Sequence, residues 1–349
     1  MNVHIDFLSA RLRAPFSSAW GSIRDRPLLL VRVEAADGHV GLGEAAPLPD
    51  YHGVGADEVL DALEACRDML AEASPGPAAA QALAEWRRMA VLPAVAAIDV
   101  ALWDLSSRQS GQPVWRRLGP RAAKPLEVNY TIAASDRAGA AAEAAAARAA
   151  GFGCVKVKVG IGDDAGRLAA VRAVLGPDVA IRLDANGAWS VDEAVAALGS
   201  LAPVGIELCE EPVHGLEQTR QVAAAVPQVA LALDETASAA GALDDRVCQA
   251  VCLKIAGFGG ITGLLDAGRR ARAVGYEVYL ASTLDGPLGV AAALHAAAAL
   301  GPDRPCGLAT LGLLADREDP LTPRAGRMEI PAGPGLGDGL SDWYRAGVV

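Results

Sequence analysis

The sequence of 349 residues predicts an α/β fold, a modified (β/α)8 (TIM-like) barrel with an N-terminal α+β capping domain. From about residue 126, short apolar runs alternate with Ala-rich helical stretches, which is the pattern of a parallel barrel. The residues before about 120 do not follow this rhythm. The main alternative, an open doubly wound sheet, would need a glycine-rich phosphate loop after its first strand, and residues 129–135 contain no glycine. These three observations favour the barrel.

Residues 1–120 are expected to form the capping domain, which the tail at residues 320–349 completes. The tail is rich in proline and is expected to pack back on this domain. Alternating apolar residues predict the strands, and apolar residues at helical spacing predict the helices. The expected elements are strands at residues 28–33 and 39–44, joined by a turn, and helices near residues 56–73 and 93–109.

Residues 121–319 are expected to form the catalytic barrel, with eight strands and seven marked helices. The last helix is poorly marked, so the barrel is expected to be modified there. The strands are predicted at residues 126–131, 154–158, 179–183, 204–209, 229–233, 251–255, 276–281 and 305–308, and the helices near residues 136–150, 163–175, 191–201, 215–225, 239–246, 262–274 and 288–300.

Three acidic residues follow consecutive strands of this barrel. Asp184, Glu210 and Asp234 each stand where an apolar run stops, about 26 and about 24 residues apart. Any one of them alone could simply cap the next helix. Because the carboxyl ends of the strands meet at one rim, three carboxylates would converge there and repel one another unless a cation neutralised them. Oxygen ligands favour a hard divalent ion, so the sequence predicts a Mg²⁺ site, with Mn²⁺ as the alternative.

Two lysines flank the acids in strand order. Lys158 ends the strand before Asp184, and Lys254 ends the strand after Asp234, so they are expected to face each other across the metal. This arrangement suits removal of a proton next to a carboxylate, with Lys158 as the base. Lys158 must be neutral for that role, and both the metal and the nearby Lys156 disfavour its ammonium form. Lys254 is either a second acid/base or a fixed cation.

Three further residues are expected to support the site. Asn186 orients a metal ligand or only stabilises a turn. Glu235 follows Asp234 directly, so it points to the opposite face of the strand and is expected to contact the ligands from behind. Asp285 follows the seventh strand, where it touches substrate or caps the next helix, and the cap is favoured.

Loops of the capping domain are expected to cover the barrel mouth. They carry Trp20, Tyr51 and His52, which we expect to form a substrate lid.

Composition restricts the partners. The net charge of −11 argues against binding to nucleic acid or to an anionic membrane surface, but it does not identify a substrate. The expected partner, a small-molecule carboxylate substrate, follows from the arrangement of the metal site and the two lysines. The six cysteines show no CxxC spacing, which indicates reduced core thiols rather than zinc ligands. The N-terminus lacks the pattern of a secretion signal, so a cytoplasmic enzyme is expected, with a homo-oligomer as a further expectation.

Six motifs together resemble the enolase superfamily, specifically its muconate-lactonising subgroup, over nearly the whole chain. The resemblance implies that Lys158 and Lys254 are catalytic and that Asp184, Glu210 and Asp234 bind the metal. The motifs lie at residues 96–104, 156–158, 184–187, 210–212, 234–235 and 254–262.

Within the subgroup the chain is most similar to the o-succinylbenzoate synthases, through residues 43–48, 282–289 and 306–314. That likeness implies a carbon-oxygen lyase of menaquinone biosynthesis, which dehydrates 2-succinyl-6-hydroxy-2,4-cyclohexadiene-1-carboxylate through an enediolate that Mg²⁺ stabilises. Two positions depart from the usual pattern, since Thr236 stands where Ser is usual and Asp285-Gly286 stands where Glu-Ser is frequent.

Other functions remain open at this stage. A racemase of N-acylamino acids or an epimerase of dipeptides would use both lysines, and exchange of the α-proton with deuterium in either enantiomer would identify it. Dipeptide epimerases carry an Asp-x-Asp after the eighth strand, where this chain has Ala309-Thr-Leu-Gly312. A cycloisomerase is a more distant option. A non-catalytic binding protein is the other class, and failure to bind Mg²⁺ would favour it.

Overall fold

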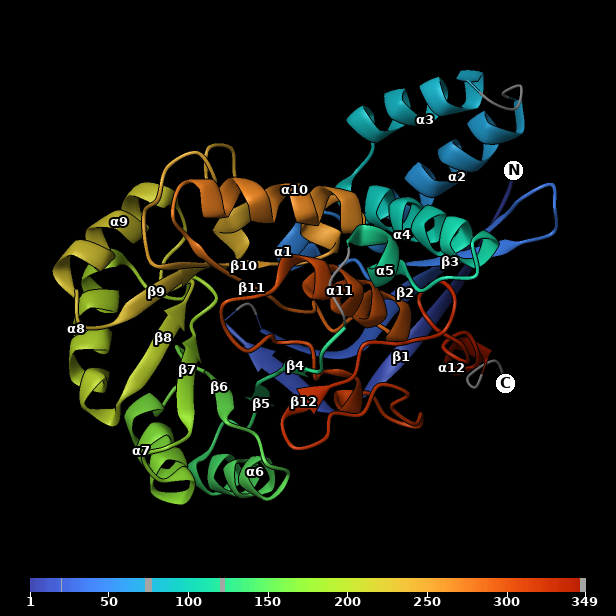
Figure 1. Ribbon diagram of the computed structural model, residues 1–349. Helices are drawn as coiled ribbons and strands as arrows, with labels where there is room; N and C mark the ends of the chain where they lie inside the picture. The colour runs from blue at the N-terminus through green and yellow to red at the C-terminus, as the bar shows by residue number, and fades with distance from the viewer. Residues whose placement is uncertain (20, 73–76, 120–122, 346–349) are drawn as a thin grey trace.

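A parallel sheet of seven strands forms most of a barrel, and a smaller domain lies against it (Figure 1). The computed structural model describes residues 1–19, 21–72, 77–119 and 123–345. The strands are adjacent in sequence order, as expected for successive β/α units. They are β5 (Tyr130–Ile132), β6 (Cys154–Lys158), β7 (Ala180–Asp184), β8 (Ile206–Glu210), β9 (Ala230–Leu233), β10 (Ala250–Leu253) and β11 (Glu277–Leu280).

The eighth position of the barrel is irregular. Residues 306–307 form only two isolated parallel bridges, Cys306 with Val128 and Gly307 with Ala281, in place of the strand predicted at residues 305–308. These bridges lie between the two outer strands, β5 and β11. The prediction of a modified barrel is confirmed, and the modification falls on its last strand.

Helices cover the outside of the barrel (Figure 1). Their inner faces are built largely from alanine. In α6, for example, Ala140, Ala144 and Ala147 are fully buried at helical spacing. Ser190 and Glu193 form a capping box that begins α8. The helices are α6 (Arg137–Ala149), α7 (Asp164–Leu175), α8 (Val191–Leu201), α9 (Leu216–Ala225), α10 (Gly260–Ala273) and α11 (Pro287–Leu300).

The prediction of a helix at residues 239–246 is wrong. A short 3-10 helix, η2 (Glu235–Ser238), is followed by turns instead. Gly241 adopts a positive φ of 82°, which a helix cannot accommodate. Asp244 and Asp245, which follow it, pair with Arg270 and Arg220 on neighbouring helices.

The capping domain is an antiparallel sheet of three strands covered by helices. The strands are β1 (Asn2–Ser18), β2 (Gly21–Glu34) and β3 (Val40–Ala45), in that order. The sequence analysis did not predict β1. The sheet and α4 touch closely at Gly43, where an added Cβ would lie 2.0 Å from the carbonyl oxygen of Ala97. The helices are α1 (Pro49–His52), α2 (Ala56–Glu72), α3 (Pro77–Met89), α4 (Leu92–Gln109) and α5 (Val114–Leu118).

The C-terminal segment contacts both the barrel and the capping sheet. Its short strand β12 (Arg327–Met328) pairs with β4 (Leu126–Glu127), and Leu314 bridges Leu12 on β1. The final helix, α12 (Asp342–Arg345), brings Tyr344 against Glu44 on β3. No helix among the described residues is both long and apolar enough to cross a membrane.

Candidate active site

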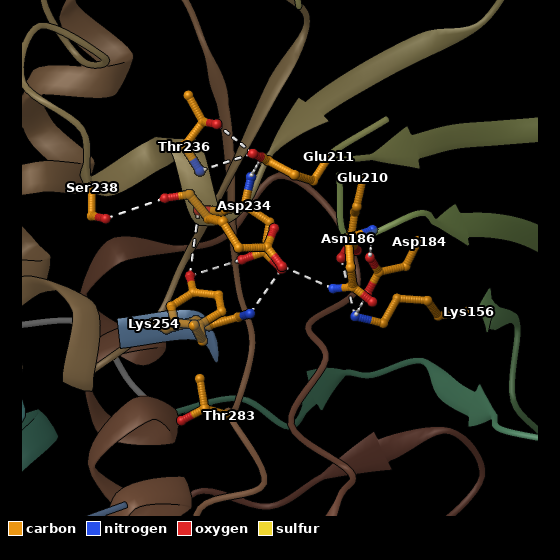
Figure 2. A network of polar contacts seen from close by, with 12 residues as sticks. Lys156, Asp184, Asn186, Glu210, Glu211, Asp234, Thr236, Ser238, Lys254 and Thr283 are labelled. Atoms are coloured by element: carbon orange, nitrogen blue, oxygen red, sulfur yellow. Dashed lines mark hydrogen bonds and ion pairs between the residues drawn. The ribbon is translucent and has the colours of Figure 1, made fainter. Parts of the chain in front are cut away.

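Five charged side chains gather at the carboxyl end of the barrel. Lys158, Asp184 and Glu210 are the last residues of β6, β7 and β8, and they lie side by side in the strand register. Asp234 and Lys254 directly follow β9 and β10. Each of the five is at most 6% exposed. The strand ends therefore bring together the residues that the sequence analysis selected, and Figure 2 shows most of this cluster.

Lysine ammonium groups pair with all three carboxylates. The Nζ of Lys158 lies 2.7 Å from Oδ2 of Asp184, and the Nζ of Lys254 lies 2.7 Å from Oδ2 of Asp234. Lys156, one layer deeper on β6, lies 3.0 Å from both Asp184 Oδ2 and Glu210 Oε2. The buried charges therefore balance within the cluster, as buried ion pairs require.

Burial and ion pairing have opposite effects on the pKa values of these groups. Burial alone would raise the pKa of Asp184, but the ammonium groups of Lys158 and Lys156 hold it well below its usual range. Burial likewise opposes the charged form of Lys254, yet the carboxylate of Asp234 raises the pKa of this lysine above its usual range. At Glu210 burial prevails and the pKa of its carboxyl is raised. The cluster thus holds ionised groups away from solvent.

The acidic side chains fit a divalent cation. Ligand atoms of Glu210, Asp234 and Cys252 lie within 4.8 Å of one another, and all three residues are buried. Asp184 lies beside Glu210 in the strand register and supplies a further carboxylate. Carboxylate oxygens are the donors that Mg²⁺ prefers. The sequence analysis did not select Cys252, although it shares a strand face with Lys254 two residues later and so points into the barrel.

Asn186 links Lys158 to Asp184 and Glu235. Its side-chain oxygen accepts a hydrogen bond of 2.7 Å from Lys158 Nζ, and its side-chain nitrogen donates to Glu235 at 2.8 Å. Its backbone N–H donates to Asp184 at 3.1 Å. The backbone of Asn186 is left-handed, with a φ of 47°, so both of its expected roles, turn former and orienting group, occur together.

Glu211 fixes the chain that carries Asp234. Its fully buried carboxylate accepts hydrogen bonds from the backbone N–H of Asp234 at 2.8 Å and from the backbone N–H and hydroxyl of Thr236 (Figure 2). Burial, followed by the charge of Asp234, raises the pKa of the neighbouring Glu235 well above its usual range. Glu211 therefore fixes the backbone that carries Asp234, and Glu235 supports the cluster through its hydrogen bond with Asn186.

The capping domain places an aromatic ring against each rim lysine. The hydroxyl of Tyr51 donates to Asp234 Oδ1 at 3.0 Å, and its ring centre lies 3.9 Å from Lys254 Nζ. The ring centre of Phe16 lies 5.5 Å from Lys158 Nζ. Both contacts have the geometry of a cation–π interaction. Phe16 and the contact between Tyr51 and Asp234 were not predicted.

Of the other two residues predicted to form the lid, Trp20 and His52, the structure describes only His52. Trp20 lies outside the described residues. His52 is not among the residues that line the cavity above Lys158 and Lys254; it lines a separate hollow, together with Tyr51. Its Nδ1 accepts a hydrogen bond of 3.0 Å from the backbone N–H of Leu48, and burial lowers the pKa of His52 to about 3. Within the described chain, His52 therefore supports the loop rather than facing the cavity.

A cavity of about 130 Å³ opens above Lys158 and Lys254. Of the described residues that line it, the only charged one outside the cluster of rim lysines, Lys156 and carboxylates is Asp50, which is exposed. Apart from Asn186, whose carboxamide also lines the cavity, its remaining walls are apolar or carry hydroxyl groups. These wall residues are Phe16, Ser18, Gly21, Ser22, Ile23, Leu48, Tyr51, Thr131, Ser282, Thr283, Leu284, Gly307, Thr310 and Leu313.

Asp285 neither lines this cavity nor caps α11. Its carboxylate turns back and accepts hydrogen bonds from the hydroxyl of Thr283 at 2.7 Å and from the backbone N–H of Thr283 at 3.3 Å. The residue at the cap of α11 is Gly286, which has no side chain to cap the helix. The favoured expectation of a helix cap is therefore wrong.

Two family models match the chain. One, described as "Enolase C-terminal domain-like", covers residues 139–342, and the other, described as "Mandelate racemase / muconate lactonizing enzyme, N-terminal domain", covers residues 3–119. The chain belongs to the enolase superfamily, in its muconate-lactonising subgroup. The resemblance inferred from the motifs is confirmed.

Relatives in this superfamily differ in their reactions. The chain is 31% identical to the L-Ala-D/L-Glu epimerase of Bacillus subtilis, over 83% of this chain and 82% of the relative. It is 29% identical to muconate cycloisomerase 1 of Pseudomonas putida, over 93% and 91%. Among solved structures, the N-succinyl Arg/Lys racemase of Bacillus cereus superposes with a TM-score of 0.88 at 25% identity, over 98% of this chain and 96% of that chain. The dipeptide epimerase of Cytophaga hutchinsonii, solved with Mg and D-Ala-L-Val, has a TM-score of 0.85 at 26% identity, over 97% of both chains.

Proposed function

We propose that this enzyme is a Mg²⁺-dependent racemase or epimerase of α-amino acids whose nitrogen carries an acyl group. Such a substrate is either an N-acylamino acid or the C-terminal residue of a dipeptide. The observation that carries this proposal is the placement of Lys158 and Lys254 on opposite sides of one carboxylate cluster. Inversion at a carbon needs one group to remove a proton from one face and another to return a proton to the opposite face.

Each lysine can serve one configuration of the substrate. Lys158 Nζ in its neutral form takes the α-proton from one enantiomer, the C–H electron pair moves into the substrate carboxylate, and the ammonium group of Lys254 delivers a proton to the other face. The opposite enantiomer reverses these roles. Asn186 and Asp184 orient Lys158, while Asp234 and Tyr51 orient Lys254. A divalent ion held by Asp184, Glu210 and Asp234 would bind the substrate carboxylate and balance its developing charge.

The cavity walls support an acylated nitrogen. A free ammonium group beside the reacting carbon would need a buried acidic partner. The only acidic lining residue outside the catalytic cluster, among those described, is the exposed Asp50 at the capping loop. The hydroxyl of Ser282, which accepts hydrogen bonds from the backbone N–H of Asp285 and the hydroxyl of Thr310, can instead donate its own proton to an amide or acyl oxygen. In a dipeptide, Asp50 could bind the ammonium group of the more distant residue.

Deuterium exchange tests the proposal. Mg²⁺-loaded enzyme is incubated in D2O with both enantiomers of N-succinyl and N-acetyl amino acids and with dipeptides, and the α-proton signal is followed by NMR. We expect exchange with inversion in the wild type. Lys158→Ala should lose exchange of one enantiomer and Lys254→Ala should lose exchange of the other. Loss of both exchanges in each variant would contradict the division of roles, and no exchange by metal-loaded enzyme would reject the proposal.

A second candidate is the syn dehydration of 2-succinyl-6-hydroxy-2,4-cyclohexadiene-1-carboxylate, the reaction of an o-succinylbenzoate synthase. The observation in its favour is that Lys254 is held between Asp234 and the ring of Tyr51, as a fixed cation would be. In that reaction Lys158 alone would remove the proton and return it to the departing hydroxyl as water leaves. Metal-dependent loss of diene absorbance, absent in Lys158→Ala, would identify this activity.

A further inference from the structure

Arg26 is an almost fully buried arginine that bonds to two distant loops. It lies on β2 with 1% of its surface exposed. Its guanidinium group donates hydrogen bonds of 2.8 and 2.6 Å to the carbonyl oxygens of Ala46 and Pro47 in the capping domain. It also donates to the carbonyl oxygens of Thr283 at 3.1 Å and Leu284 at 3.5 Å, after the barrel strand β11. One rigid fork of donors therefore spans the boundary between cap and barrel.

Both loops bonded by Arg26 form walls of the substrate cavity. Leu48 follows Pro47 directly and lines the cavity from the cap, while Thr283 and Leu284 line it from the barrel. Leu284 has a φ of 61°, in the left-handed region that residues other than glycine, asparagine and aspartate rarely adopt. The wall conformation is therefore imposed by the contacts around it rather than by local preference.

Two further buried groups hold the same wall from its other end. We call residues 283–288 the wall segment. Glu44 on β3 accepts a hydrogen bond of 2.7 Å from the backbone N–H of Gly286 and another from the hydroxyl of Tyr344. The Tyr344 hydroxyl oxygen in turn accepts a hydrogen bond of 3.0 Å from the backbone N–H of Leu288. The cap sheet and the C-terminal helix therefore clamp both ends of the wall segment.

We propose that Arg26 is a positioning residue that determines substrate selectivity, because it fixes the spacing between the capping loop at residues 46–48 and the wall segment. The catalytic lysines and metal ligands have their own partners and do not contact Arg26 through any of these hydrogen bonds. A change at Arg26 therefore alters which substrates fit rather than the proton-transfer groups. The choice of test substrates rests on the proposed function, whereas the clamp itself does not.

The chain offers a matched control in Arg172. This arginine on α7 also donates only to backbone carbonyl oxygens in its recorded hydrogen bonds, those of Val204, Gly176, Val179 and Gly205, at 2.6 to 2.9 Å. None of these residues lines the cavity. Arg26→Lys and Arg172→Lys therefore both keep the charge and lose the planar fork, but only the first affects the cavity walls.

Two measurements on the full-length, Mg²⁺-loaded enzyme test the proposal. The first is kcat and KM over N-acylamino acids of increasing acyl size. We expect Arg26→Lys to change the ratio of kcat/KM between small and large substrates by roughly tenfold, mainly through KM, because small displacements of positioning groups are this costly. Mg²⁺ affinity, measured by calorimetry, should change less than this ratio, because Arg26 makes none of its hydrogen bonds to Asp184, Glu210 or Asp234. Arg172→Lys should leave the ratio at the wild-type value.

The second measurement is hydrogen–deuterium exchange of the backbone, read by mass spectrometry, which needs no substrate. Arg26→Lys should increase exchange in peptides covering residues 46–50 and 282–288 together, and Arg172→Lys should not. Equal exchange in the two variants would overturn the proposal, as would an unchanged selectivity ratio. If the wild type turns over none of the substrates, the proposed function fails, and the exchange result alone then decides on the clamp.

Discussion

Glu44 should make the stability of the enzyme depend on pH in a specific way. Its carboxyl group is 4% exposed, and burial, together with the nearby charge of Asp285, raises its pKa from 4.5 to about 7. A carboxyl whose folded-state pKa is raised favours folding only while it is protonated. Its stabilising contribution is complete below about pH 4.5 and is lost as the pH rises through about 7.

The size of this effect follows from the shift. The rise in pKa from 4.5 to about 7 corresponds to about 3–4 kcal/mol in total, at roughly 1.4 kcal/mol per pKa unit. Between about pH 5 and about pH 8 the expected loss of free energy of unfolding from this one group is about 2–3 kcal/mol. Glu44→Gln has no proton to lose, so its stability should lack this component.

Urea unfolding of wild type and Glu44→Gln across that pH range provides the assay. The difference between the two free energies of unfolding isolates Glu44, because both proteins keep their other titrating groups. We expect the wild type to lose stability relative to the variant as the pH rises. Parallel stability profiles for the two proteins would refute the reasoning, since they would mean that Glu44 titrates equally in the folded and unfolded chains.

Three other changes have defined outcomes. Asp234→Asn should weaken Mg²⁺ binding at least a hundredfold in calorimetry, since it removes one of the anionic oxygen ligands; unchanged affinity would contradict its assignment as a ligand. Tyr51→Phe keeps the ring but removes the hydroxyl bonded to Asp234, so it should weaken Mg²⁺ binding roughly tenfold while the melting temperature changes little. Gly43→Ala should destabilise the protein by about 1–3 kcal/mol in thermal unfolding, because the new Cβ would meet the backbone of α4 at 2.0 Å. Gly199→Ala, on α8 with open space around it, is the matched control and should be neutral or slightly stabilising.

The rim of the barrel could be predicted from the sequence because each key residue ends a strand or directly follows one. The position of such a residue depends only on where an apolar run stops and on the parallel order of the strands. Lys158, Asp184 and Glu210 are neighbours in register for this reason. Strand order does not predict the contacts that the capping domain makes with the rim, since the contact of Tyr51 with Asp234 joins segments that are 183 residues apart.

Other features depended on information that local patterns lack. The helix expected at residues 239–246 failed because Gly241 takes a left-handed conformation within an otherwise helix-compatible stretch. Asp285 was expected to cap a helix, but its side chain found a nearer donor in Thr283. The motifs predicted the superfamily and subgroup, whereas the relatives described above are epimerases, a racemase and a cycloisomerase and do not support the dehydratase specificity.

The contact between Tyr344 and Glu44 has a consequence for the order in which the protein matures on the ribosome. The cap sheet is synthesised first, and the rim is complete once Lys254 has been made. The wall segment, however, gains the support of Tyr344 only after α12 has been synthesised, well after Lys254. A chain that terminates just before Tyr344 would carry every reactive group but an unsupported wall. The support of this wall is thus completed later in synthesis than the charged rim of the barrel.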